Sequence, residues 1–126
     1  MTVLIDSCGW IEYFSEGQLA DKYAKFIEKV NMIEYITPSI VLYEVYKRIK
    51  SVKGEQKALT AVAQIMAYTT VIAIDSKIAL VAAEISLSSK LPMADSLIKA
   101  VAKDFDAKIV TSDEHFKNFP DAVFIN

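Results

Sequence analysis

The sequence contains a single cysteine, three glycines and three prolines among its 126 residues. One cysteine excludes an intrachain disulfide, forms no zinc site by itself and agrees with a reducing compartment, so we expect Cys8 to pack beside the first strand. The scarcity of glycine and proline, without any low-complexity stretch, argues against a flexible linker or a disordered tail. Because 53% of the residues are hydrophobic, we expect one domain over residues 1–126.

Long apolar runs are also missing from the chain. No stretch approaches the roughly 20 apolar residues that a membrane helix requires. Residues 1–5 run directly into Asp6 and lack the charged and apolar regions of a signal peptide. These two absences predict a cytoplasmic protein.

Basic residues do not exceed acidic ones, since 14 lysines and arginines stand against 16 acidic residues. A nucleic-acid partner usually accompanies a basic excess, because the phosphates attract lysine and arginine. If four carboxylates held metal ions, however, 14 basic residues would face 12 acidic ones, and the bound cations would attract phosphate. The net charge of −2 is therefore compatible with an RNA substrate but is no evidence for one.

Short apolar segments rich in β-branched residues alternate with amphipathic ones along the chain. The segments expected to form strands are Thr2–Ile5, Met32–Thr37, Thr69–Ile74, Ala107–Thr111 and Ala122–Ile125. The segments with helical spacing are a short turn at Trp10–Phe14, Gln18–Lys29 with Val30 continuing its apolar face, Ser39–Lys53, Glu55–Tyr68, Ser76–Ser88 and Pro92–Phe105. The expected caps are Ser39, either Asp75 or Ser76, and Gly54 at a helix end.

This alternation predicts a three-layer α/β/α domain. Strands that are apolar throughout are typical of a mostly parallel sheet with helices on both faces, here with four or five strands. In such sheets the ligand site lies beyond the carboxyl ends of the strands, where the strand order reverses. Asp6 and Asp113 both follow expected strands and should lie near that edge.

Four carboxylates stand out by position, although each also has a structural interpretation. Asp6 and Asp113 are placed to cap the segments that follow them. Glu44 is the only charge in a stretch of mostly apolar residues, where it either pairs with Arg48 four residues on or faces a polar cleft or a cation. Asp95 follows Pro92 in a first helical turn, where the helix dipole favours an acid.

Taken together, the four acids predict a metal site. Carboxylates that follow two strands and lie near two helix starts would converge on one edge of the sheet, and like charges this close repel unless cations neutralise them. Oxygen ligands without further cysteine or a histidine pair favour Mg²⁺ or Mn²⁺ over zinc. His115 is expected to be exposed or structural, with a substrate contact as the alternative.

The segments Val3–Ser7, Asp95–Ile98 and Ile109–Asp113, together with the mid-chain helix that carries Glu44, resemble the PIN domain. The resemblance spans nearly the whole chain, and the compact form resembles the VapC toxins, the ribonuclease halves of toxin–antitoxin pairs. It implies strand order 3-2-1-4-5, with the ends of the first and fourth strands at the switch point. Some relatives carry an aspartate where this chain has His115, which bears on how a second metal ion would be held.

The resemblance also implies a site and an activity. Asp6, Glu44, Asp95 and Asp113 would form the acidic site, with Asp6 and Asp95 foremost on the metal. The hydroxyl groups that orient it would come from Ser7 and Thr111. The implied reaction is hydrolysis of RNA phosphodiester bonds with Mg²⁺ or Mn²⁺ activating a water. Candidates for contact with phosphate are Lys47, Arg48 and Lys99, and the alternative for each is an ordinary solvated surface position.

The implied partners are an antitoxin and a second copy of the chain. An antitoxin segment would enter the acidic cleft, where it could place an arginine among the carboxylates. Core packing is the ordinary role of the aromatic residues near the early helices, but they could also supply an apolar groove for the antitoxin: Trp10, Tyr13, Phe14, Tyr43 and Tyr46.

Other classes fit less well. A phosphoacceptor receiver domain needs paired acids after the first strand, and a haloacid-dehalogenase phosphatase needs an Asp-x-Asp motif there, but Ser7 and Cys8 follow Asp6. A non-catalytic PIN-like binding module that uses the cleft for protein contact is the remaining alternative, and it is disfavoured because the acids are intact.

Overall fold

The structure, a computed structural model, describes residues 1–29 and 33–126. Val30 and Met32, which the sequence assigned to a helix and to the second strand, lie outside the described residues. The elements in chain order are β1 Thr2–Ile5, α1 Ser7–Ser15, α2 Ala20–Ile27, β2 Glu34–Pro38, α3 Ser39–Lys53, α4 Glu55–Tyr68, β3 Thr70–Ile72, α5 Ser76–Ser89, α6 Met93–Asp104, β4 Lys108–Thr111, the 3₁₀ helix η1 Glu114–Phe116 and β5 Ala122–Phe124.

The strands form one parallel sheet in the order β3-β2-β1-β4-β5. This confirms the order that the resemblance implied. At the centre, Leu4 of β1 pairs with Ile36 of β2 on one side and with Ile109 of β4 on the other. All three side chains are almost fully buried, as expected of a strand covered on both faces.

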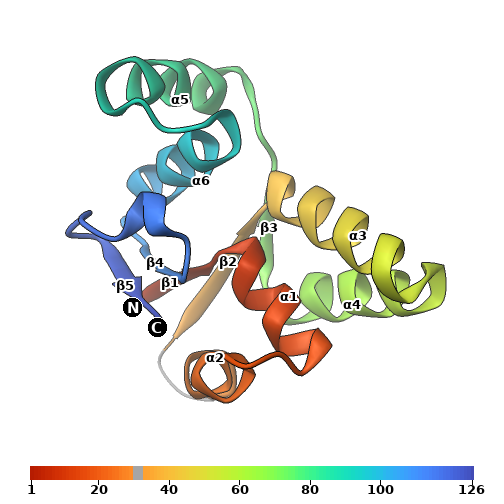
Figure 1. Cartoon of the computed structure of the whole chain (residues 1–126). Helices are drawn as coiled ribbons and strands as arrows, with labels where there is room; N and C mark the ends of the chain where they lie inside the picture. Colours follow the sequence, from red (N-terminus) through yellow and green to blue (C-terminus); the bar gives the residue numbers. More distant parts are fainter. Residues whose placement is uncertain (30–32) are drawn as a thin grey trace.

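Helices cover both faces of the sheet, so the three-layer architecture is confirmed. Figure 1 shows α1 to α4 on one side of the sheet and α5 and α6 on the other. This division follows from the connections, because right-handed crossovers toward β3 place their helices on one face and the return crossover to β4 uses the opposite face. Within the described parts of the chain, no helix is long and apolar enough to span a membrane.

Three local expectations were wrong. The first helix begins at Ser7, directly after Asp6, and is much longer than the expected turn at Trp10–Phe14. Ser39 does not cap its helix, because its hydroxyl accepts a hydrogen bond from Ile74 N at 3.3 Å instead. The expected strand over residues 69–74 is reduced to β3. The prediction of Gly54 as a helix end is confirmed, and there a φ of 95° suits glycine.

The reversal of strand order lies between β1 and β4. The chain leaves β1 toward β2 on one side, whereas β4 is the neighbour on the other side. The carboxyl ends of these two strands are Ile5 and Thr111, so the residues that follow them emerge side by side at one edge of the sheet. This edge is where a ligand site is expected in an open parallel sheet.

Candidate metal centre

Asp6 is held at the end of β1 by groups from two segments. Its Oδ1 accepts a hydrogen bond from Ser7 N at 2.7 Å, which caps α1, and its Oδ2 accepts one from Thr111 Oγ1 at 2.8 Å. The side chain is only 2% exposed. Burial raises the pKa of this carboxyl, and the charge of Asp113 adds to the rise, whereas the hydrogen bonds from Thr111 and Ser7 oppose it.

Thr111 connects two of the acids. Its hydroxyl donates to Asp6 and accepts a hydrogen bond from the backbone N–H of Asp113 at 2.9 Å. Thr111 is fully buried, so the position of this hydroxyl is fixed by the surrounding core. These two hydrogen bonds support the prediction, drawn from the resemblance, that Thr111 orients the site.

Glu44 extends from the second turn of α3 toward the same edge. Burial raises the pKa of its carboxyl, and the charges of Asp6 and Asp113 raise it further, while Ser7 partly offsets the rise. Among the described residues, its Oε1 atom is buried and has no hydrogen-bond partner. A buried carboxylate oxygen without a donor is unfavourable unless a cation or another ligand compensates it.

Asp95 completes the set from the first turn of α6. Burial, followed by the charges of Asp113 and Asp6, raises the pKa of Asp95 to about 6, and Glu44 adds a smaller rise. The imidazole of His115 acts in the opposite direction. The four acids predicted from the sequence therefore act on one another electrostatically, as carboxylates that share one site do.

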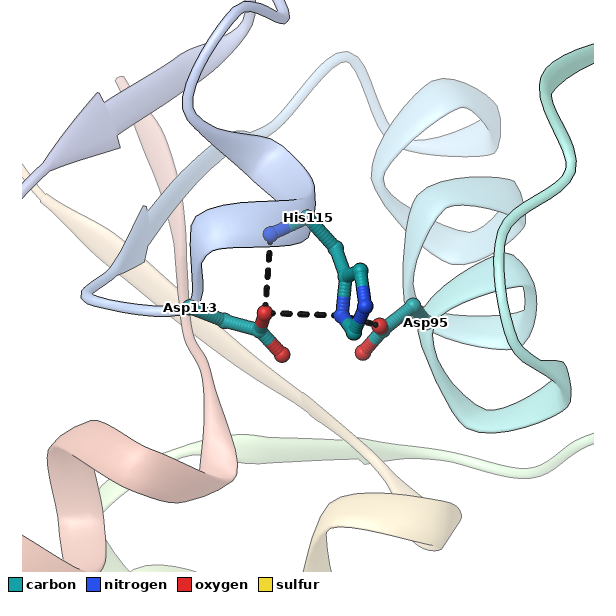
Figure 2. A group of neighbouring side chains, drawn as sticks. All are labelled: Asp95, Asp113 and His115. Atoms are coloured by element: carbon teal, nitrogen blue, oxygen red, sulfur yellow. Dashed lines mark hydrogen bonds and ion pairs between the residues drawn. The ribbon is translucent and has the colours of Figure 1, made fainter.

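Asp113 lies between the β4 end and η1, and it faces Asp95 across the ring of His115. Its Oδ1 accepts a hydrogen bond from the backbone N–H of His115 at 2.9 Å, which caps η1. Figure 2 shows the imidazole between the two carboxylates, with Nδ1 at 2.8 Å from Asp95 Oδ2 and 2.9 Å from Asp113 Oδ1. One ligand atom from each of the three residues lies within 4.8 Å of the others.

The residues fit a divalent cation. The unpartnered Oε1 of Glu44 and the raised pKa values of Asp6 and Asp95 indicate negative charge that the protein itself does not compensate. A hard cation bound by carboxylate oxygens would relieve both conditions. The capping interpretations are correct as well, because Asp6 caps α1 and Asp113 caps η1. Each carboxylate keeps further lone pairs that can bind a cation.

A cleft of about 520 Å³ is lined by one of the four acids, Glu44, and by Ser7 and Ser112, which are the chain neighbours of Asp6 and Asp113. Lys47 and Arg48, which the sequence proposed for phosphate contact, line it together with Glu44. Lys99 does not line this cleft, because its ammonium pairs with Asp121 and lies over the ring of Phe119. Lys99 is thus a structural cation, and its proposed contact with phosphate is withdrawn.

A second hollow, of about 490 Å³, lies between α1, α2 and α4. Its wall includes three of the aromatic residues expected to form a groove, Trp10, Tyr13 and Phe14. Of the other two, Tyr43 lines the cleft of Glu44, Lys47 and Arg48 and is 59% exposed, and Tyr46 lines neither of the two hollows. Three of the five aromatic residues therefore line one hollow, and its use by an antitoxin stays a prediction.

Sequence reasoning missed a group of interacting side chains next to Asp6, made of the buried Tyr23 and the half-buried Cys8 and Ser112. The Cys8 thiol lies 3.7 Å from Asp6 Oδ2 and 3.5 Å from the hydroxyl of Tyr23, and Tyr23 donates to Ser112 Oγ at 2.8 Å. Burial is the main cause that raises the pKa of the Cys8 thiol. Cys8 does pack beside the sheet, as expected, but it also supports the site. No local sequence signal could reveal this contact, because Tyr23 comes from α2.

The chain belongs to the PIN domain family. The family model described as the PIN domain matches residues 3–122, which includes all four acids. This confirms the resemblance drawn from the sequence. No curated protein matches the chain significantly in sequence.

Solved structures of toxin–antitoxin proteins share this fold. A toxin–antitoxin complex from Klebsiella pneumoniae aligns with a TM-score of 0.77 and 22% identity over 96% of this chain and 95% of that one. VapBC2 from Rickettsia felis, bound to a promoter DNA fragment, aligns with a TM-score of 0.76 and 16% identity over 100% of this chain and 98% of that one. Mycobacterium tuberculosis VapC20, described as a sarcin-ricin loop cleaving toxin, aligns with a TM-score of 0.76 and 15% identity over 94% of this chain and 97% of that one.

Proposed function

We propose that this chain is a metal-dependent endoribonuclease that hydrolyses RNA phosphodiester bonds. The observation that carries the proposal is the convergence of Asp6, Glu44, Asp95 and Asp113, with raised pKa values at three of them, beside the ends of β1 and β4. Such an arrangement is unfavourable for folding unless it holds cations, so a catalytic use is the simplest reason for it. The activity resides in a single domain.

The proposed cofactor is Mg²⁺ or Mn²⁺. When bound, the cation supplies the Lewis acid that activates water and neutralises charge on the phosphodiester. Asp6 and Asp95 would hold the principal ion, and Asp113 would complete or share its coordination. Glu44 would bind a second ion or orient the attacking water. Thr111 keeps Asp6 and the backbone at Asp113 in register through its two hydrogen bonds, and Ser7 fixes the other oxygen of Asp6.

The proposed substrate is RNA bound along the cleft of Lys47 and Arg48. These two cations face phosphate groups from the same cleft wall that carries Glu44, so they attract the backbone without reading bases. Support for RNA comes from VapC20, whose description names cleavage of the sarcin-ricin loop. The choice of bases at the cleavage site would depend on the loops around this cleft.

We also propose that the chain is the toxin of a cytoplasmic toxin–antitoxin pair and forms a homodimer. The structures it resembles include toxin–antitoxin complexes. The hollow beside Trp10 and Phe14 suits an apolar helix of the antitoxin, and exposed apolar side chains on α5 and α6, among them Leu80, Leu87 and Met93, suit a second copy. Monomers at micromolar concentration in light scattering would contradict the homodimer.

The test of the nuclease is cleavage of a mixed RNA pool by protein purified without antitoxin. We expect cleavage with Mg²⁺ or Mn²⁺, none with EDTA, and none by the Asp6→Asn plus Asp95→Asn double variant. Asp21→Asn, an exposed acid on α2, is the matched control and should cleave normally. DNA of the same sequences shows whether the activity is confined to RNA.

Folded protein that cleaves nothing with either metal would favour the alternative function, a PIN-like module that binds protein through its acidic cleft. Growth of bacteria that express the chain tests the toxin function separately. We expect arrest with the wild type and normal growth with the double variant. Equal arrest by both proteins would show that toxicity does not arise from this site.

A further inference from the structure

His115 occupies a special place in the proposed site. It is the only histidine of the chain. Its Nδ1 lies 2.8 Å from Asp95 Oδ2 and 2.9 Å from Asp113 Oδ1, so one nitrogen meets carboxylates from two different segments (Figure 2). Nδ1 can carry only one proton, so without an ion the two oxygens would have to share that proton in a bifurcated hydrogen bond. A cation among the three atoms would interact with all of them.

The imidazole is held firmly enough to act as a ligand. The backbone N–H of His115 donates a hydrogen bond to Asp113 Oδ1, which holds the residue next to the carboxylate that its ring faces. The next residue, Phe116, is fully buried and anchors η1 in the core. The His115 side chain is 55% exposed, so an ion from solvent can reach the group.

The spacing matches that of neighbouring ligands on one metal ion. Two ligand atoms at about 2.1 Å from a metal, at right angles, lie about 3 Å apart. The two distances from Nδ1 to the carboxylates agree with that separation, and the ligand atoms of all three residues lie within 4.8 Å.

We propose that His115 Nδ1 is a metal ligand alongside Asp95 and Asp113, and that it makes the site prefer a first-row transition-metal ion, such as Mn²⁺, over Mg²⁺. This inference rests on the proposed function, because it concerns the ion of the same site. Mg²⁺ favours oxygen ligands and loses its water shell reluctantly. Imidazole nitrogen adds affinity for transition-metal ions and adds little for Mg²⁺.

The direct test is pulsed electron paramagnetic resonance of Mn²⁺ bound to the full chain, prepared without a polyhistidine tag. Because the chain has one histidine, imidazole ¹⁴N modulation of the Mn²⁺ signal has a single possible source. Calorimetric titration with Mn²⁺ and with Mg²⁺ gives the affinities independently of activity. The variants are His115→Asp, which keeps an oxygen donor, His115→Ala, and Glu114→Gln, an exposed control on the same 3₁₀ helix.

We expect nitrogen modulation in the wild type and in Glu114→Gln, and none in either His115 variant. In His115→Ala, Mn²⁺ binding should weaken by about tenfold or more, while Mg²⁺ binding changes far less. Bound Mn²⁺ without nitrogen modulation in the wild type would overturn the inference and leave the metal-dependent nuclease intact. Absence of Mn²⁺ binding in the wild type would overturn the inference, and absence of both Mn²⁺ and Mg²⁺ binding would overturn the metal-dependent nuclease as well.

Discussion

Replacing Asp95 by asparagine should stabilise the metal-free protein while it abolishes metal binding. Burial and the neighbouring acids raise the pKa of Asp95 to about 6 from an ordinary 3.8. The folded protein therefore holds this proton more tightly than the unfolded chain does. Between about pH 4 and pH 6 the stabilising contribution of protonated Asp95 is lost as pH rises, and above that range the full penalty of its ionised carboxylate is present.

The size of the penalty follows from the same pKa. A rise from 3.8 to about 6 corresponds to at most about 3 kcal/mol. Solvent reaches part of the site, so screening reduces this to about 1–2 kcal/mol. Asparagine keeps the shape of the aspartate side chain and can still accept a hydrogen bond from His115. Asp95→Asn should therefore raise the free energy of unfolding at pH 7.5 by about 1–2 kcal/mol. The gain corresponds to a rise in Tm of about 3–8 °C in a domain of this size.

Thermal unfolding followed by circular dichroism in EDTA measures the effect at pH 7.5 and pH 4. The Asp95→Asn gain should be present at pH 7.5 and nearly absent at pH 4, and Asp21→Asn should change Tm little at both. Added Mn²⁺ should raise the Tm of the wild type but not of Asp95→Asn, since only a protein that binds the ion gains from it. Destabilisation by Asp95→Asn at pH 7.5 in EDTA would refute the reasoning.

Three further predictions concern side chains around the acids. Thr111→Val removes the hydroxyl that links two of them, so kcat/KM should fall at least tenfold and the free energy of unfolding by about 1–2 kcal/mol in denaturant titration. Tyr23→Phe removes the hydrogen bond to Ser112 and the weaker contact with the Cys8 thiol, so it should lower the free energy of unfolding by about 1 kcal/mol, with a smaller loss of activity than Thr111→Val in the same assays. A larger loss of activity than for Thr111→Val would contradict this. Replacing Lys47 and Arg48 by alanine should raise KM with little change in kcat. It should also reduce the slope of the logarithm of RNA affinity against the logarithm of salt concentration by about one to two, the number of counterions no longer released.

Most of the fold could be predicted because its strands are apolar throughout. A segment such as Thr2–Ile5 has one stable place, the centre of a covered sheet, and α3 and α4 have the bounds that Pro38, Gly54 and their apolar spacing indicated. The strand order came from the family resemblance and not from the pattern, since local periodicity does not encode which strands are neighbours.

The start of α1 was misjudged for a tertiary reason. Gly9 lowers helix propensity, but it is needed inside this helix because a Cβ there would lie 2.5 Å from the ring of Tyr23. That contact also brings Tyr23 to Cys8, next to Asp6. Neither relation is visible in a linear sequence, because α2 supplies the partner.

At the site, sequence position selected four acids that act on one another electrostatically in the fold, and the expectation of an exposed or structural His115 is confirmed by its 55% exposed side chain and its contacts with Asp95 and Asp113. Strand ends and helix starts are places where carboxylates converge, so Asp6, Asp95 and Asp113 could be selected by their positions along the chain alone. His115 had no such signal, since one histidine near a helix start is ordinarily exposed. Its relation to Asp95 depends on the approach of α6 to η1, which only the folded chain provides.

The most direct test of the account is anomalous diffraction from crystals of the wild-type protein soaked in Mn²⁺. The account predicts a peak bounded by Asp95 and Asp113, within reach of Asp6 and Glu44, and its loss in crystals of the Asp6→Asn plus Asp95→Asn variant. A well-ordered site without any peak, or a peak that lies away from these carboxylates, would contradict the claim that the four acids form a metal centre.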